Sequence, residues 1–160
     1  MKQNSAIQAV CVLTQGSIKG HILFTETQKG DKVRVSLFLK NVPQGDHGFH
    51  IHKTGDLREG CSSLCAHYNP YNKEHGGRMM KERHVGDLGN IRPTREGKVE
   101  ISFLDPLIKL RGPTSILGRS VVIHEDKDDL GLGLNEESKK TGNAGKRIAC
   151  GVIGYSKDCM

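Results

Sequence analysis

The chain has 160 residues, which fits one hydrophobic core, and we expect a single domain over residues 1–160. Aromatic residues make up 4% of the chain and tryptophan is absent, so the core must come from Val, Ile and Leu, while 20 glycines favour short strands and turns. The net charge of +6 permits a nucleic-acid partner, but acids interrupt the basic residues and no aromatic RNA-reading motif is present. These features favour a general attraction for small anions over a nucleic-acid-binding module.

The sequence also bears on the compartment. Its first ten residues lack the apolar stretch of a signal peptide, and no apolar run is long enough to span a bilayer. We therefore expect a cytoplasmic protein with no membrane partner. A cytosolic chain usually keeps its thiols reduced, and five cysteines cannot all pair within one chain, so the sequence leaves their connectivity open. The cysteines are Cys11, Cys61, Cys65, Cys150 and Cys159.

Strand patterns occupy the first third of the chain. Residues 6–13 and 18–24 are short apolar segments joined around Gly16, which predicts a hairpin. Residues 33–39 alternate strictly between apolar and other side chains, the pattern of a half-buried strand. A turn then leads into the strand GFHIH at 48–52.

The rest of the chain alternates between strands and two long loops. Residues 53–84 and 125–147 have no sustained period and are rich in Gly, Asn and charge, and loops of this length are uncommon unless they are functional. Together with the first four strands, this pattern predicts an all-β, eight-stranded antiparallel Greek-key barrel or sandwich with two long functional loops. The four further strands are predicted at residues 85–91, 98–104, 120–124 and 148–155.

The stretch from residue 47 to residue 87 holds six of the eight histidines. Neutral imidazole suits zinc and copper, and His50 and His52 are two residues apart, so on a strand they point to one face and can share a metal ion. The spacing of the later histidines suits a loop that folds back on itself, which Gly76 and Gly77 favour. The other candidates are His47, His67, His75, His84, Asp87 and, further along, His124.

A lone histidine is more often a core or surface residue than a ligand. Clustering changes that expectation, because a solvated polar loop gives no reason for six histidines with a carboxylate at the end. The histidines are interior and spaced, which excludes an expression tag. The sequence therefore predicts a metal site.

Several motifs together resemble the copper/zinc superoxide dismutase family. They are GFHIH, HYNP-x4-HGG-x6-HVGDLGN, GRSVVIHE, DDLG, NEESKKTGNAG and RIACGVIG. The match covers about residues 6–155 and is dense from 47 to 154. The resemblance implies one dismutase domain with a Greek-key barrel, carrying one copper and one zinc ion per subunit.

Carried over position by position, the resemblance implies two ligand sets. His67 would belong to both, its deprotonated ring bridging the metals. Imidazoles accept Cu(II) and Cu(I), so copper can cycle, whereas redox-inert zinc in a closed site would act structurally and electronically. The implied copper ligands are His50, His52, His67 and His124. The implied zinc ligands are His67, His75, His84 and Asp87.

The resemblance also assigns side chains around the copper. Arg147 matches the active-site arginine, where a fixed cation attracts superoxide and orients it toward the metal. Thr141 matches a residue that narrows the channel, and Lys140 matches a rim lysine with Glu136 and Glu137 as its acidic companions. For any one rim charge, the alternative is an ordinary surface residue.

Two further assignments depend on the resemblance. Asp128 matches a carboxylate that links a copper-ligand ring to a zinc-ligand ring, although without the resemblance it would be one more solvated acid. Cys61 and Cys150 match an intrasubunit disulfide, and the alternative is two buried free thiols. Cys65 lies outside the family pattern, and we interpret it as an inert thiol rather than a competing ligand or a wrong disulfide partner.

The function implied is dismutation of superoxide by a homodimer, which protects against oxidative stress. Cu(II) would oxidise one superoxide to oxygen, and Cu(I) would reduce a second to hydrogen peroxide, with His67 detaching on reduction and supplying a proton. The alternative is a non-enzymatic relative, a copper-chaperone-like domain or a decoy, but such relatives lose copper ligands or the arginine. The dimer contact would involve residues 116–118 and 151–155. Loading by a copper chaperone is left open.

Overall fold

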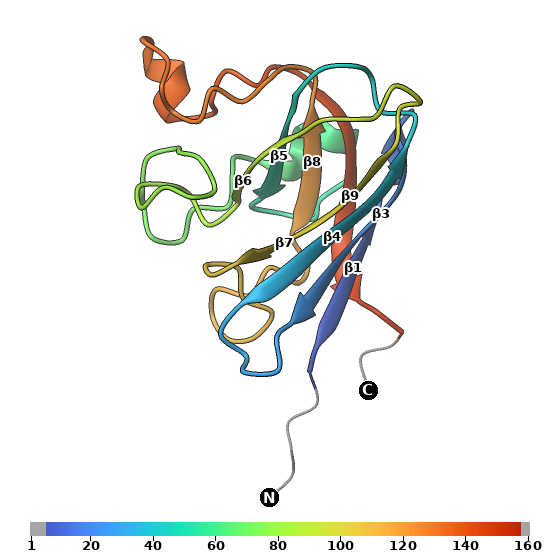
Figure 1. The fold of residues 1–160 in the computed structure, drawn as a ribbon. Coiled ribbons are helices and arrows are strands. Elements are labelled where there is room, and N and C mark those ends of the chain that lie inside the picture. The colour runs from blue at the N-terminus through green and yellow to red at the C-terminus, as the bar shows by residue number, and fades with distance from the viewer. Residues whose placement is uncertain (1–5, 158–160) are drawn as a thin grey trace, which may run out of the picture.

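The computed structural model describes residues 6–157, which form an all-β barrel with two short 3-10 helices (Figure 1). All eight predicted strands are present. The pattern did not predict the two-residue strand β2, because two residues are too few to show alternation. The strands are β1 (Gln8–Val12), β2 (Gln15–Gly16), β3 (Lys19–Glu26), β4 (Val33–Lys40), β5 (His47–His52), β6 (Asp87–Ile91), β7 (Val99–Asp105), β8 (Ser120–His124) and β9 (Arg147–Tyr155), and the helices are η1 (Gly60–Leu64) and η2 (Glu136–Lys139).

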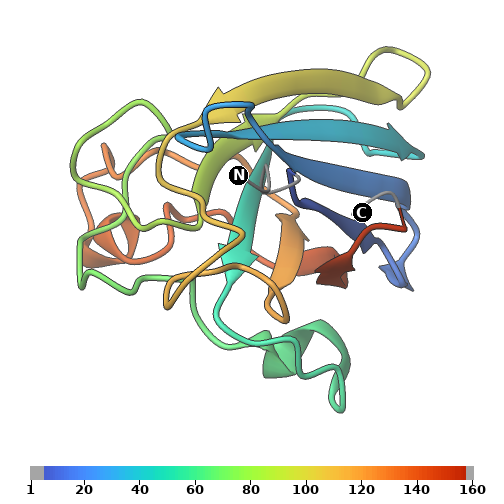
Figure 2. The same ribbon diagram turned by 90° about the horizontal axis from the view of Figure 1, so that it is seen from below.

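Every named pair of strands is antiparallel. The strand order is β6-β5-β8-β9-β1-β3-β4-β7, so the connections from β4 to β5 and from β6 to β7 cross between the two halves, as the Greek-key prediction requires. Figure 2 shows the strands curling around a common interior, with β6 and β7 at the two ends of the strand order. The eight-stranded antiparallel barrel is therefore confirmed.

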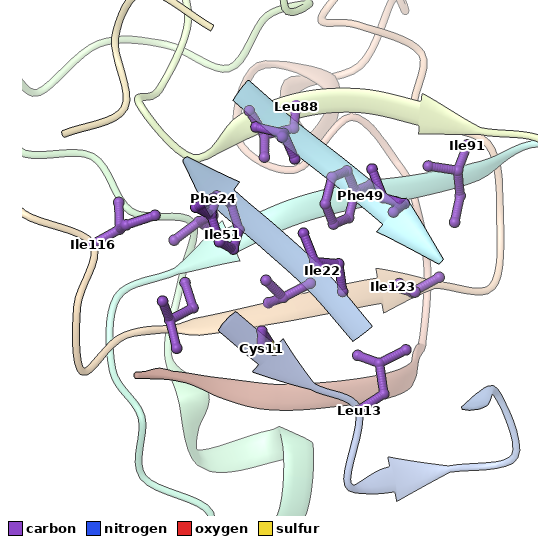
Figure 3. Packing of buried hydrophobic residues seen from close by; sticks show 14 of the residues in the cluster. Cys11, Leu13, Ile22, Phe24, Phe49, Ile51, Leu88, Ile91, Ile116 and Ile123 are labelled. Carbon is purple, nitrogen blue, oxygen red and sulfur yellow. The ribbon is translucent and has the colours of Figure 1, made fainter. Parts of the chain in front are cut away.

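The core fills the interior of this barrel and is mainly aliphatic, as the composition predicts. Phe24 and Phe49 are its fully buried aromatic rings, and Ile22, Ile51 and Ile123 pack around them (Figure 3). Cys11 also lies in this cluster. Burial raises the pKa of its thiol to about 12, so the thiol stays protonated and acts as a small apolar side chain.

The two long loops lie on one side of the barrel, beside β5, β6 and β8 (Figure 1). The backbone N–H of His75 in the first loop donates to the carbonyl of Lys139 in the second, at 2.8 Å. The N–H of Gly48 in β5 donates to the carbonyl of Asp126, at 2.9 Å. The loops therefore form a second layer over the outer face of β5 and β8. Within the described residues, no helix is both long and apolar enough to cross a membrane.

Candidate metal centre

The histidines of β5 point away from the barrel core. Phe49 and Ile51 belong to the core cluster, so His50 and His52, which alternate with them, face the layer formed by the loops. The end of β8 brings His124 to the same place, and a bridge between His52 and His67 joins β5 to the first loop. The candidate ligands are all buried, with at most 6% of any residue exposed: His50, His52, His67, His75, His84, Asp87 and His124.

One group of ligand atoms contains His50, His52, His67 and His124, and these atoms lie within 4.8 Å of one another. The Nε2 atoms of His52 and His124 are 3.3 Å apart. The structure therefore brings together the four side chains that the resemblance predicted for copper.

A second group adjoins the first and contains His50, His67, His75 and Asp87, again within 4.8 Å. The prediction named His84 in place of His50. The Nδ1 atom of His84 lies 3.2 Å from Asp87 Oδ1 and 3.3 Å from His67 Nδ1, so His84 also borders this group. His50 and His67 belong to both groups by distance, so the two groups meet at these two rings.

The donor atoms fit metal ligation. Within residues 6–157, two buried ring nitrogens of this cluster have no hydrogen-bond partner, His50 Nδ1 and His67 Nε2, and His75 Nδ1 lies 3.0 Å from Asp87 Oδ1. A buried polar atom left without a partner costs about 1–3 kcal/mol, and a metal ion would give both of these lone pairs a partner. A set of imidazoles with one carboxylate suits copper and zinc.

Asp128 orients two of these rings. The Nε2–H groups of His50 and His75 donate to its two carboxylate oxygens, each at 2.7 Å. Both rings thereby present Nδ1 to the cluster, where that of His50 has no partner and that of His75 faces Asp87 Oδ1 at 3.0 Å. Asn90 holds Asp128 in turn through two hydrogen bonds, of 2.8 and 2.9 Å. No local pattern in the sequence marks this role of Asn90, because its partner lies 38 positions away.

Backbone carbonyls orient the other rings. The Nδ1–H of His52 donates to the carbonyl of Cys65 at 2.8 Å, and that of His124 donates to the carbonyl of Gly145 at 3.1 Å. Each ring therefore turns Nε2 toward the cluster. His47 takes no part as a ligand, because its two ring nitrogens face the carbonyls of His124 and Pro43 at 2.9 and 2.7 Å.

Burial keeps most of these imidazoles neutral. It lowers the pKa of His50, His52 and His67, and lowers that of His124 to about 4. Burial alone would also lower the pKa of His75, but its bonds to Asp128 and Asp87 outweigh burial and raise it to about 9. Most rings therefore offer lone pairs at neutral pH, while binding at His75 must displace a proton.

Asp87 remains ionised despite its burial. Burial raises its pKa, but hydrogen bonds from His67, His75 and His84 outweigh burial and hold the pKa far below its usual range. Its other oxygen accepts from the backbone N–H of Gly76 at 3.0 Å and of His84 at 2.8 Å. The cluster therefore contains one fixed negative charge.

A hollow of about 570 Å³ opens onto the first group. His52, His67 and His124 line it together with Arg147, whereas the carboxylate and the remaining rings of the second group do not. Of the predicted channel residues, Glu137, Lys140 and Thr141 line the hollow and Glu136 lies nearby on η2, outside the lining. Burial lowers the pKa of Arg147, and the guanidinium remains charged at neutral pH.

The predicted disulfide between Cys61 and Cys150 is present and joins the first loop to β9. Two backbone carbonyls hold Arg147: its Nη1–H donates to the carbonyl of Cys61 at 2.9 Å, and its Nη2–H donates to that of Cys65 at 2.6 Å. The disulfide fixes the first of these carbonyls, because Cys61 is one of its two residues. Among the described residues, Cys11 and Cys65 are free thiols. Cys159 lies outside the described residues.

The fold and the site define a β-barrel metalloprotein with two adjoining sets of buried ligands, one open to solvent and one closed. Residues 18–153 match the family described as copper/zinc superoxide dismutase (SODC). The chain is 53% identical over 153 residues to a Cu-Zn superoxide dismutase of Paramecium bursaria Chlorella virus 1, covering 95% of this chain and 80% of that protein. It therefore belongs to the copper/zinc superoxide dismutase family.

Two further matches extend over almost the whole chain. An extracellular Cu-Zn superoxide dismutase of Drosophila melanogaster is 48% identical over 158 residues, which cover 95% of this chain and 87% of that protein. A solved structure of the clock protein EA4 superposes with a TM-score of 0.90 at 45% identity, covering 95% of this chain and 96% of that one.

Proposed function

We propose that this chain is a superoxide dismutase, an oxidoreductase that converts superoxide to oxygen and hydrogen peroxide and protects against oxidative stress. The observation that carries the proposal is the pair of adjoining buried ligand groups, one of which opens onto a hollow beside Arg147. A small anion can enter this hollow and meet both a fixed cation and three metal-ligating side chains. Residues 1–160 would form one domain, which the single large core cluster supports.

The two groups differ in their access to the hollow, as the two metals require. The group that opens onto the hollow would hold copper, where a substrate must approach, and the buried group would hold zinc in a closed site. When bound, copper would supply one-electron redox chemistry, and zinc would supply a fixed charge that does not change oxidation state. The copper ligands would be His50, His52, His67 and His124, and the zinc ligands His67, His75, His84 and Asp87.

The chain's own residues would bind, orient and protonate. Asp128 holds His50 and His75 in one tautomer, which keeps the two ligand groups in a fixed relation. Arg147 would bind the superoxide anion in the hollow. His67 reaches both groups and lines the hollow, so a proton held at its Nε2 would lie near the product.

Positive charge would also speed the encounter. Lys140 and Arg147 line the hollow, and the carboxylate of Glu137 accepts a hydrogen bond from the hydroxyl of Thr141 at 2.9 Å. Enzymes of this family are a standard example of electrostatic steering, with rate constants that reach about 10⁸–10⁹ M⁻¹s⁻¹. Added salt should slow this chain's reaction, because it screens the attraction.

The non-enzymatic alternative is not favoured. A copper-chaperone-like or decoy relative needs neither a complete copper group nor an arginine in the hollow. Here all four predicted copper side chains lie together, and Arg147 is held by two carbonyls at the hollow.

We propose a homodimer that forms through the end of β9 and the segment before β8. Gly118 and Ile153 are joined by a hydrogen bond of 2.9 Å, so the two segments form one surface. Val152 and Tyr155 expose 36% and 65% of their surface there. The change Val152→Glu should convert a dimer to a monomer in analytical ultracentrifugation, and a monomeric unmodified protein would contradict the proposal.

Two further predictions concern the cell. A cytoplasmic location and loading by a copper chaperone both agree with family membership, but one relative is named an extracellular enzyme. Fractionation of the source cells decides the compartment. Copper content in cells with and without their copper chaperone decides how the protein is loaded.

The proposed activity is tested by superoxide decay in stopped flow, on protein loaded to several copper contents at full zinc. The rate should rise in proportion to bound copper and fall at high ionic strength. The variant His124→Ala is the control, because it removes one copper ligand that does not border the zinc group. Full copper occupancy without fast decay would contradict the proposal.

A further inference from the structure

Among residues 6–157, Arg83 is the largest side chain that the barrel and its loops bury completely. Its Nε–H donates to the carbonyl of His84 at 3.0 Å, its Nη1–H donates to that of Arg78 at 2.8 Å, and its Nη2–H donates to that of Val85 at 2.8 Å. Its charge is paired with Asp105, with 2.8 Å between Nη1 and Oδ2. A buried charge is costly unless it is paired and hydrogen-bonded, so this side chain needs all of these contacts.

Asp105 connects the arginine to the barrel. It is the last residue of β7 and is fully buried, and its Oδ1 accepts from the N–H groups of Leu107 and Ile108 at 2.9 and 3.0 Å. Ile108 belongs to the core cluster. The ion pair therefore joins the first long loop to a strand end that is itself fixed by the core.

A second arginine makes a parallel contact with the same strand. The guanidinium of Arg78 lies over the ring of Phe103, 4.2 Å from its centroid, which is a cation–π contact. Phe103 and Asp105 are two residues apart on β7 and so share a face. Because Arg83 also donates to the carbonyl of Arg78, the two contacts form one unit, which we call the arginine clamp: Arg78, Arg83, Phe103 and Asp105.

The clamp lies where the barrel lacks a strand pair. β6 and β7 are the two ends of the strand order, and the segment 78–86 leads from the clamp into β6. That segment carries His84, whose carbonyl accepts a hydrogen bond from Arg83, and Asp87 follows it as the first residue of β6. No clamp contact in the described part of the chain involves the side chains of His52 or His124, which come from the barrel wall.

We propose that the arginine clamp positions His84 and Asp87 for zinc and leaves the copper group unaffected. The inference rests on the proposed function, because it assumes that these two side chains ligate zinc. None of the four clamp residues touches a metal position, so all four are positioning residues. Loss of a residue that orients a ligand typically costs about ten- to a hundredfold in metal affinity.

The test measures zinc and copper dissociation constants by chelator competition in four variants. Arg83→Lys keeps the charge but loses the planar fork that reaches three carbonyls, and we expect at least tenfold weaker zinc binding with copper binding within about threefold of the unmodified protein. Phe103→Leu removes the ring beneath Arg78 and should weaken zinc binding about threefold. Arg92→Lys is the matched control, since Arg92 pairs with Asp46 at an exposed position. Leu37→Ala in the core controls for stability.

Cobalt absorption adds a readout that stability alone does not change. Co²⁺ bound in place of zinc reports the geometry of its ligands, so its visible spectrum should change in Arg83→Lys and stay the same in Leu37→Ala. Equal weakening of both metals, or an unaltered cobalt spectrum with unaltered zinc affinity, would overturn the inference. If Arg83→Lys does not fold, Phe103→Leu decides by the same comparison. Failure of the unmodified protein to bind zinc tightly would instead contradict the proposed function.

Discussion

The two sides of the barrel use the same strand geometry for different purposes. On β4 the buried residues alternate with exposed ones, so one face packs on the core and the other meets water. On β5 and β8 every residue is buried, because the long loops cover the outer face. Side chains that would face water in an uncovered barrel, such as His50 and His52, therefore lie in a second buried layer. That layer holds polar ligands, and the inner one holds the apolar core.

The difference shows where stability and chemistry reside. The inner layer is stabilised by apolar burial, which needs no ligand. The outer layer is stabilised by hydrogen bonds, by a disulfide and, when bound, by metals, because it buries imidazoles and carboxylates that need partners. Changes to the outer layer should therefore alter loops and ligands while β3 and β4 stay intact.

Removal of the disulfide is expected to have the largest effect on the free energy of unfolding. The double change Cys61→Ser and Cys150→Ser opens a link between residues 89 positions apart, which is worth about 4–5 kcal/mol in the chain-entropy model. Urea unfolding should show a loss of this order in the free energy of unfolding. Cys65→Ser, which alters an exposed free thiol, serves as the control and should change it by less than about 0.5 kcal/mol. A similar loss in both would contradict the prediction.

A smaller effect is expected from acid on the metal-free protein. The pKa of His124 is about 4 in the folded chain and about 6.5 when unfolded, so between these values the unfolded state binds more protons and stability falls as pH falls. From pH 7 to pH 5, protonation of His124 in the unfolded chain should lower the free energy of unfolding by about 2 kcal/mol. His75 has the opposite sign, but its raised pKa of about 9 places its effect above pH 6.5.

Urea unfolding of the metal-free protein at several pH values checks this prediction. His124→Gln should flatten the slope between pH 7 and pH 5. His21, which stacks on Phe38 at the opposite side of the barrel, provides the matched control, and His21→Gln should leave the slope unchanged. Equal slopes in all three proteins would contradict the assignment.

Arg147→Ala should lower the rate of superoxide decay about tenfold, equivalent to about 1.4 kcal/mol. The change removes the fixed cation from the hollow, while the ligand side chains keep their own partners. Copper and zinc content should stay the same, and the dependence of the rate on salt should weaken. Arg147→Lys should give an intermediate rate. Unchanged activity of Arg147→Ala at full metal content would contradict the guiding role of Arg147.

The smallest effect concerns a strained residue between η1 and the ligands. Cys65 has φ 66° and ψ −155°, a backbone conformation that is largely restricted to glycine and costs about 1–3 kcal/mol. Cys65→Gly should stabilise the protein by about 1 kcal/mol after allowance for the extra entropy of glycine when unfolded. Asn72→Gly is the control, because asparagine tolerates its φ of 52° and little should change. A destabilised Cys65→Gly protein would contradict this account.

Alternation and apolar content predicted the inner layer, because they report which face of a strand is buried. The pattern GFHIH likewise predicted that His50 and His52 share a face. The outer layer was less accessible, since the two ligand sets, Asp128 and the disulfide came only from the family resemblance. Asn90 and the pair of Arg83 with Asp105 were missed altogether, because their partners lie 38 and 22 residues away and no local pattern marks such contacts.

Hydrogen exchange of the protein with and without its metals tests most directly whether the metals hold the outer layer on the barrel. On metal removal, the amides of His75 and Asp129, which donate to loop carbonyls, should lose protection. The amides shared by β3 and β4 should keep theirs, because the apolar core holds those strands without metals. Equal loss in both regions, or no change in the loops, would contradict the account.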